Sequence, residues 1–199
     1  IRRQRQMCIR DRGDLVLVGG GDPTLQTDQL GDLVAAVAKA GVKGCTGRFL
    51  YWEGALPRLK VISDDQPVHV GYNAALSGLN LNFNRVHFEW KRAGSAWQVA
   101  IDARGERFVP PVEMVEVVVA GREAPLFTYD EGPVEGWTVA SGALGKGGSR
   151  WLPVRDPGRY VAEVFRTRFA RQLPNEYVAR QQVRQLVLND YENNLPVEN

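Results

Sequence analysis

The sequence predicts a mixed α+β fold, in which a small α/β unit precedes a β-rich module and C-terminal helices. Three observations lead to this prediction. A strand pattern, a helix pattern and a second strand pattern follow one another between residues 15 and 52. Alternating apolar residues then dominate from residue 79 onward, and helical spacing of apolar residues returns after residue 156.

The first α/β unit is predicted from apolar periodicity. Residues 15–18, LVLV, are typical of a short buried strand. Apolar residues then recur at helical spacing, which predicts an amphipathic helix with Thr27 or Asp28 as its N-cap and Gly41 at its C-terminal end. The apolar positions are Leu30, Leu33, Val34 and Val37. Residues 48–52, RFLYW, are rich in β-favouring types and predict a second strand.

Residues 53–75 are predicted to form a long loop, because they are rich in Gly, Pro, Ser, Asp and Asn. At most a short strand is expected near Val61. The β-rich module begins after this loop.

The stretch RVHFEWK at 85–91 alternates strictly, which predicts a strand with Val86, Phe88 and Trp90 buried and His87 on the wet face. Residues 92–95 predict a turn, and alternation at 97–101 completes a hairpin. Further strands are predicted at 112–120 and 137–140, and a flexible loop at 141–149 (SGALGKGGS).

The C-terminal part is predicted to be helical. Asp156-Pro157-Gly158 opens a helix with one apolar stripe, and residues 180–190 have helical character as well. The stripe consists of Tyr160, Val161, Val164, Phe165 and Phe169.

Composition limits the classes of function. The chain has 199 residues and 44% hydrophobic content, enough for one fair-sized core or two small ones. Residues 1–12 (IRRQRQMCIRDR) hold five Arg and one Asp, so they carry +4 and the remaining chain −2. This segment has no helical stripe, so we expect a disordered, non-native leader rather than a basic arm. No nucleic-acid surface is therefore predicted, and no apolar run is long enough for a membrane span.

Cysteine and histidine spacing predicts neither a disulfide framework nor a metal site. Cys8 and Cys45 are too few for a framework, and Cys45 is most simply a small core residue. His69 and His87 have no Cys or carboxylate at metal-ligand spacing. No cofactor is predicted.

The stretch VLVGGGDPTL at 16–25 has the strand-glycine-helix order of a phosphate loop. A dinucleotide fingerprint requires G-x-G-x-x-G, but Thr24 stands where the third glycine belongs. Asp22 places negative charge where phosphate would lie, and Pro23 lacks a donor N–H. We therefore interpret the glycines as a tight turn.

Three stretches together resemble one family. They are LVGGGDPTL (17–25), YNAALSGLNLNFNRVHFEW (72–90) and GSRWLPVRDPGRYVAEVFRTRF (148–169). They resemble the serine-type D-Ala-D-Ala carboxypeptidases/endopeptidases, the class C low-molecular-mass penicillin-binding proteins. The resemblance implies hydrolysis of peptidoglycan peptide stems in the periplasm or cell envelope. It also implies a β-lactamase-like catalytic domain with S-x-x-K, S-x-N and K-T-G motifs.

The sequence departs from the family pattern at these motifs. None of its serines (Ser63, Ser77, Ser95, Ser141 and Ser149) is followed three positions later by Lys. Ser63-Asp64-Asp65 and Lys146-Gly147-Gly148 mimic S-x-N and K-T-G in the wrong order, and we interpret both as loop residues. In VLNDYENNLPVEN (187–199), Asn194 matches the motif Asn and is the only catalytic candidate, with Glu192 where Ser belongs. The alternative is that this segment is a polar C-terminus without a motif.

The resemblance leads to a division into four parts. We expect a leader at 1–12, an inserted α/β module at 13–75, a β-rich module at 76–150, and a return into a truncated transpeptidase domain at 151–199. Because the resemblance implies that most of that domain is missing here, we expect residues 151–199 to be loosely docked, with part of the apolar stripe exposed. The function expected is that of a carboxypeptidase/endopeptidase fragment that is inactive alone. The alternatives are a free-standing, non-catalytic module that binds peptidoglycan or a cell-wall partner, and, more weakly, a basic nucleic-acid binder.

Overall fold

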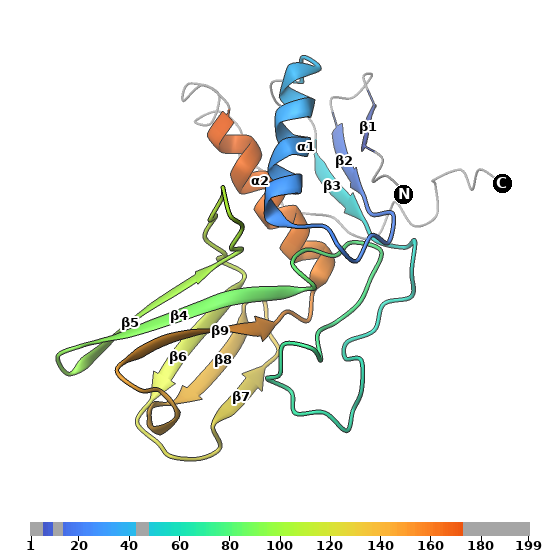
Figure 1. Ribbon diagram of the computed structural model, residues 1–199. Coiled ribbons are helices and arrows are strands. Elements are labelled where there is room, and N and C mark those ends of the chain that lie inside the picture. Colours follow the sequence, from blue (N-terminus) through green and yellow to red (C-terminus); the bar gives the residue numbers. More distant parts are fainter. Residues whose placement is uncertain (1–5, 10–13, 43–47, 173–199) are drawn as a thin grey trace.

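The computed structural model describes residues 6–9, 14–42 and 48–172 (Figure 1). The sequence prediction of a mixed α+β class is confirmed. Three three-stranded sheets are present in the described residues, together with two α-helices. No helix in these ranges has the length and apolar character needed to cross a bilayer.

The first sheet has the order β1-β2-β3 and carries the predicted α/β unit. Strands β2 (Asp14–Val18) and β3 (Phe49–Trp52) are parallel, and α1 (Thr27–Lys39) connects them. The helix begins one residue earlier than expected, because Gln26 and Gln29 form a capping box there. Gly41 has a φ of 88° just beyond the helix end, as predicted for a terminating glycine.

The prediction that residues 1–12 form a disordered leader is wrong for residues 6–9. Strand β1 (Gln6–Ile9) pairs antiparallel with β2, so the backbone in this part of the leader extends the first sheet. The remaining leader residues lie outside the described ranges, as does Cys45.

The β-rich module consists of two sheets, which Figure 1 shows as layers in the lower half of the molecule. One has the order β5-β4-β9, from β4 (Arg85–Ala93), β5 (Ala96–Asp102) and β9 (Gly147–Pro153). The other has the order β6-β8-β7, from β6 (Val115–Ala120), β7 (Phe127–Asp130) and β8 (Glu135–Ala140). The predicted hairpin is confirmed, since β4 and β5 pair around Gly94 and Ser95.

The flexible loop predicted at 141–149 is only partly present. A 3₁₀ turn occupies Ser141–Ala143, and Gly147, Gly148 and Ser149 already belong to β9. Gly148 leaves room for a neighbouring side chain, because a Cβ at this position would lie 2.8 Å from the Trp90 ring. The boundary expected at 150/151 therefore falls inside a paired strand.

Helix α2 (Pro157–Gln172) begins where Asp156-Pro157-Gly158 predicted, but its apolar face is not exposed. Tyr160, Val161, Val164 and Phe165 are each at most 1% exposed. The helix packs on α1 and β3, and the Phe165 ring stacks on Phe49 at 5.4 Å. The expected loose docking is wrong for these residues, because other parts of the same chain, α1 and β3 among them, bury their side chains. The Phe169 side chain and residues 173–199, including the helix predicted at 180–190, lie outside the described part.

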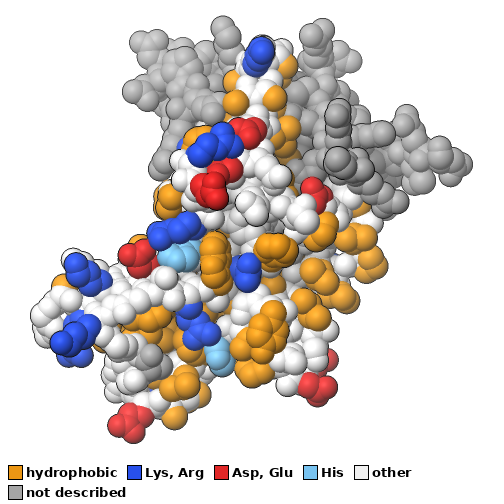
Figure 2. Space-filling view, viewed as in Figure 1, with side chains coloured by type: hydrophobic (Ala, Val, Ile, Leu, Met, Phe, Trp, Pro, Cys, Tyr) orange, Lys and Arg blue, Asp and Glu red, His pale blue; other side chains and the backbone are white. Residues whose placement is uncertain are grey.

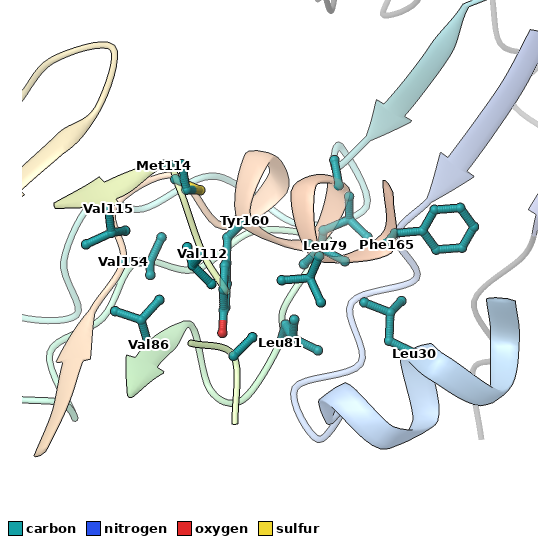
Figure 3. Close-up of a cluster of buried hydrophobic side chains, with 14 of the residues drawn as sticks. Leu30, Leu79, Leu81, Val86, Val112, Met114, Val115, Val154, Tyr160 and Phe165 are labelled. Carbon is teal, nitrogen blue, oxygen red and sulfur yellow. The ribbon is translucent and has the colours of Figure 1, made fainter. Parts of the chain in front are cut away.

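One hydrophobic core extends through both halves of the molecule, that is, the α/β unit with α2 and the β-rich module. Figure 3 shows Tyr160 of α2 pointing among core side chains from distant parts of the chain. The cluster combines Leu30 of α1 and Leu79 and Leu81 of the loop with Val86 of β4 and Val154 beyond β9. Between β3 and β4 the chain is a long loop, as predicted, with an isolated bridge at Leu59–Leu76 instead of a strand near Val61.

Candidate functional site

The glycines after β2 form a turn, as the sequence predicted, and the structure adds that this turn packs closely against the loop at Gly78. A Cβ at Gly19 would lie 2.3 Å from the Gly78 carbonyl oxygen, so only glycine allows the two segments to approach. The Gly21 N–H donates to the same carbonyl oxygen at 2.8 Å, and Gly21 has a φ of 77°. Asp22 accepts hydrogen bonds from the Thr24 N–H and hydroxyl, which fixes the turn locally. The turn thus anchors the loop that leads into β4.

That loop ends in three consecutive left-handed residues. Asn82, Phe83 and Asn84 have φ values of 50°, 58° and 54°. Asn tolerates this conformation, whereas a bulky residue such as Phe rarely adopts it. The phenyl group of Phe83 is nevertheless 54% exposed, so burial of this side chain does not offset the backbone strain.

Buried asparagines hold the loop in place. Asn82 and Thr27 exchange two hydrogen bonds at the start of α1, at 2.9 and 3.2 Å. The Asn84 Nδ2 donates to the Ala75 carbonyl oxygen at 2.7 Å and to the Asn80 Oδ1 at 2.6 Å. The Asn84 Oδ1 accepts from the Leu81 N–H. These bonds therefore attach the loop to the start of α1 and join its own segments to one another.

A pocket of about 370 Å³ opens beside this loop. Its walls are mainly apolar, with one cationic side chain and two amides. The lining residues are Pro23, Ile62, Gly71, Tyr72, Ala74, Leu76, Asn80, Phe83, Asn84 and Arg85. Tyr72 and Phe83 both line the pocket and are 66% and 54% exposed. Figure 2 shows hydrophobic side chains gathered over the loop between β3 and β4, at the right of the view.

Arg85 is the charged group of the pocket. Its guanidinium carbon lies 5.1 Å from the Phe83 ring centroid and 5.3 Å from that of Trp151. Its Nε donates to the Asn82 carbonyl oxygen, and the Tyr160 hydroxyl donates to the Arg85 carbonyl oxygen. Partial burial lowers the pKa of Arg85 from its usual value, although the group remains a cation at any physiological pH.

A second polar cluster surrounds the N-terminus of α2. The Glu135 carboxylate accepts from the backbone N–H groups of Arg155 and Asp156 at 2.8–3.0 Å. Burial raises the pKa of Glu135 to about 7, against the opposing effect of these hydrogen bonds. The Arg155 guanidinium donates to the carbonyl oxygens of Lys60, Val68 and Asn73, so it clamps the long loop to α2.

His87 does not lie on a wet face, in contrast to the prediction. The residue is 7% exposed, and its ring meets Trp151 edge-on at 5.2 Å. Its Nδ1 is 3.9 Å from Asp102, whose carboxylate pairs with Arg104. Burial and the Arg104 charge lower the pKa of His87. Alternation indicated the correct face, but it could not show that Trp151 and Asp102 cover that face.

The one catalytic candidate from the sequence, Asn194, lies outside the described residues, as does Glu192, so this assignment stays a prediction. Ser63 holds the loop through backbone contacts with the Asn73 amide, and exposed Lys146 lies just before β9. Sequence analysis missed Arg85 and Phe83. The run Asn82-Phe83-Asn84 was the available signal, because Asn on both sides of an aromatic residue favours left-handed backbone.

Comparison with known proteins gives the family. The profile of the D-Ala-D-Ala carboxypeptidase 3 (S13) family matches residues 8–185. The comparison with curated proteins finds no match.

Two crystal structures of penicillin binding protein 4 (dacB) from Haemophilus influenzae are similar in fold. One has a TM-score of 0.53 at 19% identity and aligns with 79% of this chain and 36% of that chain. The other, a complex with a novel β-lactam, has a TM-score of 0.51 at 18% identity, with 79% and 34% covered. The chain thus spans about one third of the length of these proteins.

Proposed function

Because the chain belongs to the D-Ala-D-Ala carboxypeptidase 3 (S13) family, we propose that it is part of a D-alanyl-D-alanine carboxypeptidase/endopeptidase. This enzyme hydrolyses peptidoglycan peptides through a serine acyl-enzyme, in the periplasm or cell envelope. The observation that carries the proposal is the family match over residues 8–185, together with the likeness of the fold to penicillin binding protein 4.

The proposed role of this segment is structural, because the nucleophile motif is absent from its sequence. A serine hydroxyl is a weak nucleophile and needs an adjacent base, which S-x-x-K supplies within one helical turn. None of the five serines has Lys at that spacing. We expect the reacting serine and lysine to lie outside these 199 residues, so the chain alone does not hydrolyse D-Ala-D-Ala.

The proposed organisation follows the four parts expected from the sequence. Residues 13–75 and 76–150 act as inserted modules, and residues 151–199 lead back into the catalytic domain. The fold adds one qualification, because α2 packs on α1 and β3. In the proposed enzyme, the first inserted module and this returning helix form one body.

A second candidate is a free-standing module that binds peptidoglycan or a cell-wall partner without catalysis. The specific observation in its favour is the full burial of Tyr160, Val161, Val164 and Phe165 by partners within this chain. A helix that belonged only to a missing catalytic domain would leave that face uncovered.

The test is acylation by a fluorescent penicillin, read by gel and intact mass. The complete reading frame that contains this segment is expected to form a stoichiometric serine adduct and to release D-Ala from a D-Ala-D-Ala peptide. The 199-residue chain should form no adduct. If the complete protein neither acylates nor releases D-Ala, the enzyme proposal fails and the non-catalytic module takes its place. An adduct on the 199-residue chain would overturn the expectation that it is inactive alone.

A further inference from the structure

The pocket beside the Asn82-Phe83-Asn84 segment has a net positive charge. None of its lining residues is acidic, and Arg85 is the only cation among them. Within the described part of the chain, no carboxylate lies within ion-pair distance of Arg85, and its two terminal nitrogens meet no hydrogen-bond acceptor. An arginine that contacts two aromatic rings beside a pocket, and whose two terminal nitrogens have no acceptor there, is well suited to receive a carboxylate.

The amides of the pocket are already engaged. Asn84 uses its amide for Ala75, Asn80 and Leu81, and Asn80 donates to the Ser77 carbonyl oxygen. A sugar needs many hydrogen-bond partners, and this pocket offers few free ones. The remaining walls are apolar side chains, so the preferred ligand has one anionic group on a compact apolar body.

Phe83 supports a binding role for the pocket rim. Its backbone is left-handed, and its ring is largely exposed while it packs beside Arg85. Strain of this kind is often found at ligand sites, where the surrounding structure maintains it. Asn or Gly would adopt this backbone conformation with less strain, so folding does not require Phe here. The phenyl group instead provides an apolar wall for a ligand.

We propose that this pocket binds the C-terminal carboxylate of a short apolar peptide. Arg85 pairs with the carboxylate, while Phe83 and Tyr72 cover the last one or two side chains. The volume of about 370 Å³ is at the small end of the range for ligand pockets, which fits a dipeptide-sized group. No serine is among the residues that line this pocket, so binding of a carboxylate there requires no acyl-enzyme.

Two sources share this ligand chemistry: the D-alanyl end of a cell-wall peptide and the C-terminus of a protein. The probes are therefore N-acetyl-D-Ala-D-Ala and N-acetyl-L-Ala-L-Ala, each with its C-terminal amide as a control. Binding is followed by amide chemical shifts of the 199-residue chain. Stronger binding of the D-peptide assigns the cell-wall source, and stronger binding of the L-peptide assigns the protein source.

We expect saturable chemical-shift changes in residues 71–85 with at least one of the two peptide acids. The matching peptide amide should bind about tenfold or more weakly, because a hydrogen bond to a charged group is lost. Arg85→Gln should lower the affinity for the peptide acid by roughly tenfold to a hundredfold and leave the affinity for the peptide amide unchanged. Arg92→Gln removes the same charge from the same strand, far along the hairpin, and should bind like the unmodified chain. Phe83→Asn should weaken acid and amide alike.

Equal binding of acid and amide would overturn the proposal. So would the absence of saturable shifts in 71–85, or unchanged acid binding by Arg85→Gln. If Arg85→Gln does not fold, the acid-against-amide comparison on the unmodified chain decides instead. The penicillin experiment reads a serine outside this pocket, so its failure and the failure of this proposal are distinguishable.

Discussion

Phe83 makes opposite contributions to stability and to the proposed binding. A left-handed conformation costs a typical L-residue about 1–2 kcal/mol, and Asn escapes part of that penalty. Phe83→Asn should therefore raise the free energy of unfolding by about 1 kcal/mol, measured by urea denaturation. Asn84→Ala is the matched contrast, because it removes three buried hydrogen bonds and should destabilise. A loss of stability in Phe83→Asn would show that the phenyl group supports the fold.

Glu135 should make stability depend on pH. Its folded pKa of about 7 lies above the unfolded value of 4.5, so the folded state holds more protons between these values. The contribution of this group to stability should be greatest below pH 4.5 and should fall by about 3 kcal/mol as pH rises from there through 7. Glu135→Gln should remove this fall, measured by urea denaturation from pH 5 to 8.

The control for this prediction is Glu131→Gln in the preceding turn. Glu131 is exposed and pairs with Lys60, which lowers its pKa, so its removal should leave the fall between pH 5 and 7 in place. If Glu135→Gln and the unmodified chain show the same pH profile, Glu135 does not titrate in this window.

At the scale of elements, the sequence predicts those whose pattern is local. The strand at 15–18, the helix with Leu30, Val34 and Val37, and the β4–β5 hairpin follow from periodicity and turn residues. The first three residues of β9 fall within the loop predicted at 141–149, because glycines at 147 and 148 are typical of turns. Their reason is tertiary, since they make room for the Trp90 side chain. A pattern that serves a distant neighbour is not visible along the chain.

The glycine turn after β2 provides a test at this scale. A Cβ at Gly19 would lie 2.3 Å from the Gly78 carbonyl oxygen, which is backbone and cannot move aside like a side chain. Gly19→Ala should therefore destabilise by about 1–3 kcal/mol, as overpacking does. Gly145→Ala is the control, because its Cβ would meet nothing within 4 Å. Equal midpoints of thermal unfolding for the two variants would contradict the close approach of β2 and the loop.

At the scale of the whole molecule, the sequence did not predict how the parts join. Periodicity predicts the apolar stripe of α2, but it does not indicate which part of the chain covers that stripe. The partners are α1 and β3, which precede α2 by more than a hundred residues in sequence. Likewise, the candidate pocket is assembled from the turn at Pro23 and the loop at 62–85. Contacts between such distant segments leave no periodic signal in either one.

Contacts between these distant segments predict how the molecule unfolds. Tyr160 of α2 donates to the Arg85 carbonyl oxygen of β4, and Glu135 of β8 holds the N-terminus of α2. The Asp28 carboxylate at the start of α1 accepts from backbone N–H groups of Arg107 and Phe108, beyond β5. One hydrophobic cluster also includes residues from both halves. With so many shared contacts, neither half should remain folded when the other opens.

We therefore expect a single cooperative transition for the chain. Far-UV circular dichroism at 222 nm reports mainly on α1 and α2, whereas tryptophan fluorescence reports mainly on Trp90, Trp97, Trp137 and Trp151 of the β-rich module. The two signals should give the same midpoint and slope in urea, because a two-state protein gives coincident transitions by different probes. Separate midpoints would instead mean that the chain unfolds in independent parts, as the boundaries expected at 75/76 and 150/151 imply. Tyr160→Phe, which removes the hydrogen bond to Arg85, tests the same point. In a single cooperative unit this variant should shift both transitions equally. If α2 opens alone, only the circular dichroism transition should shift.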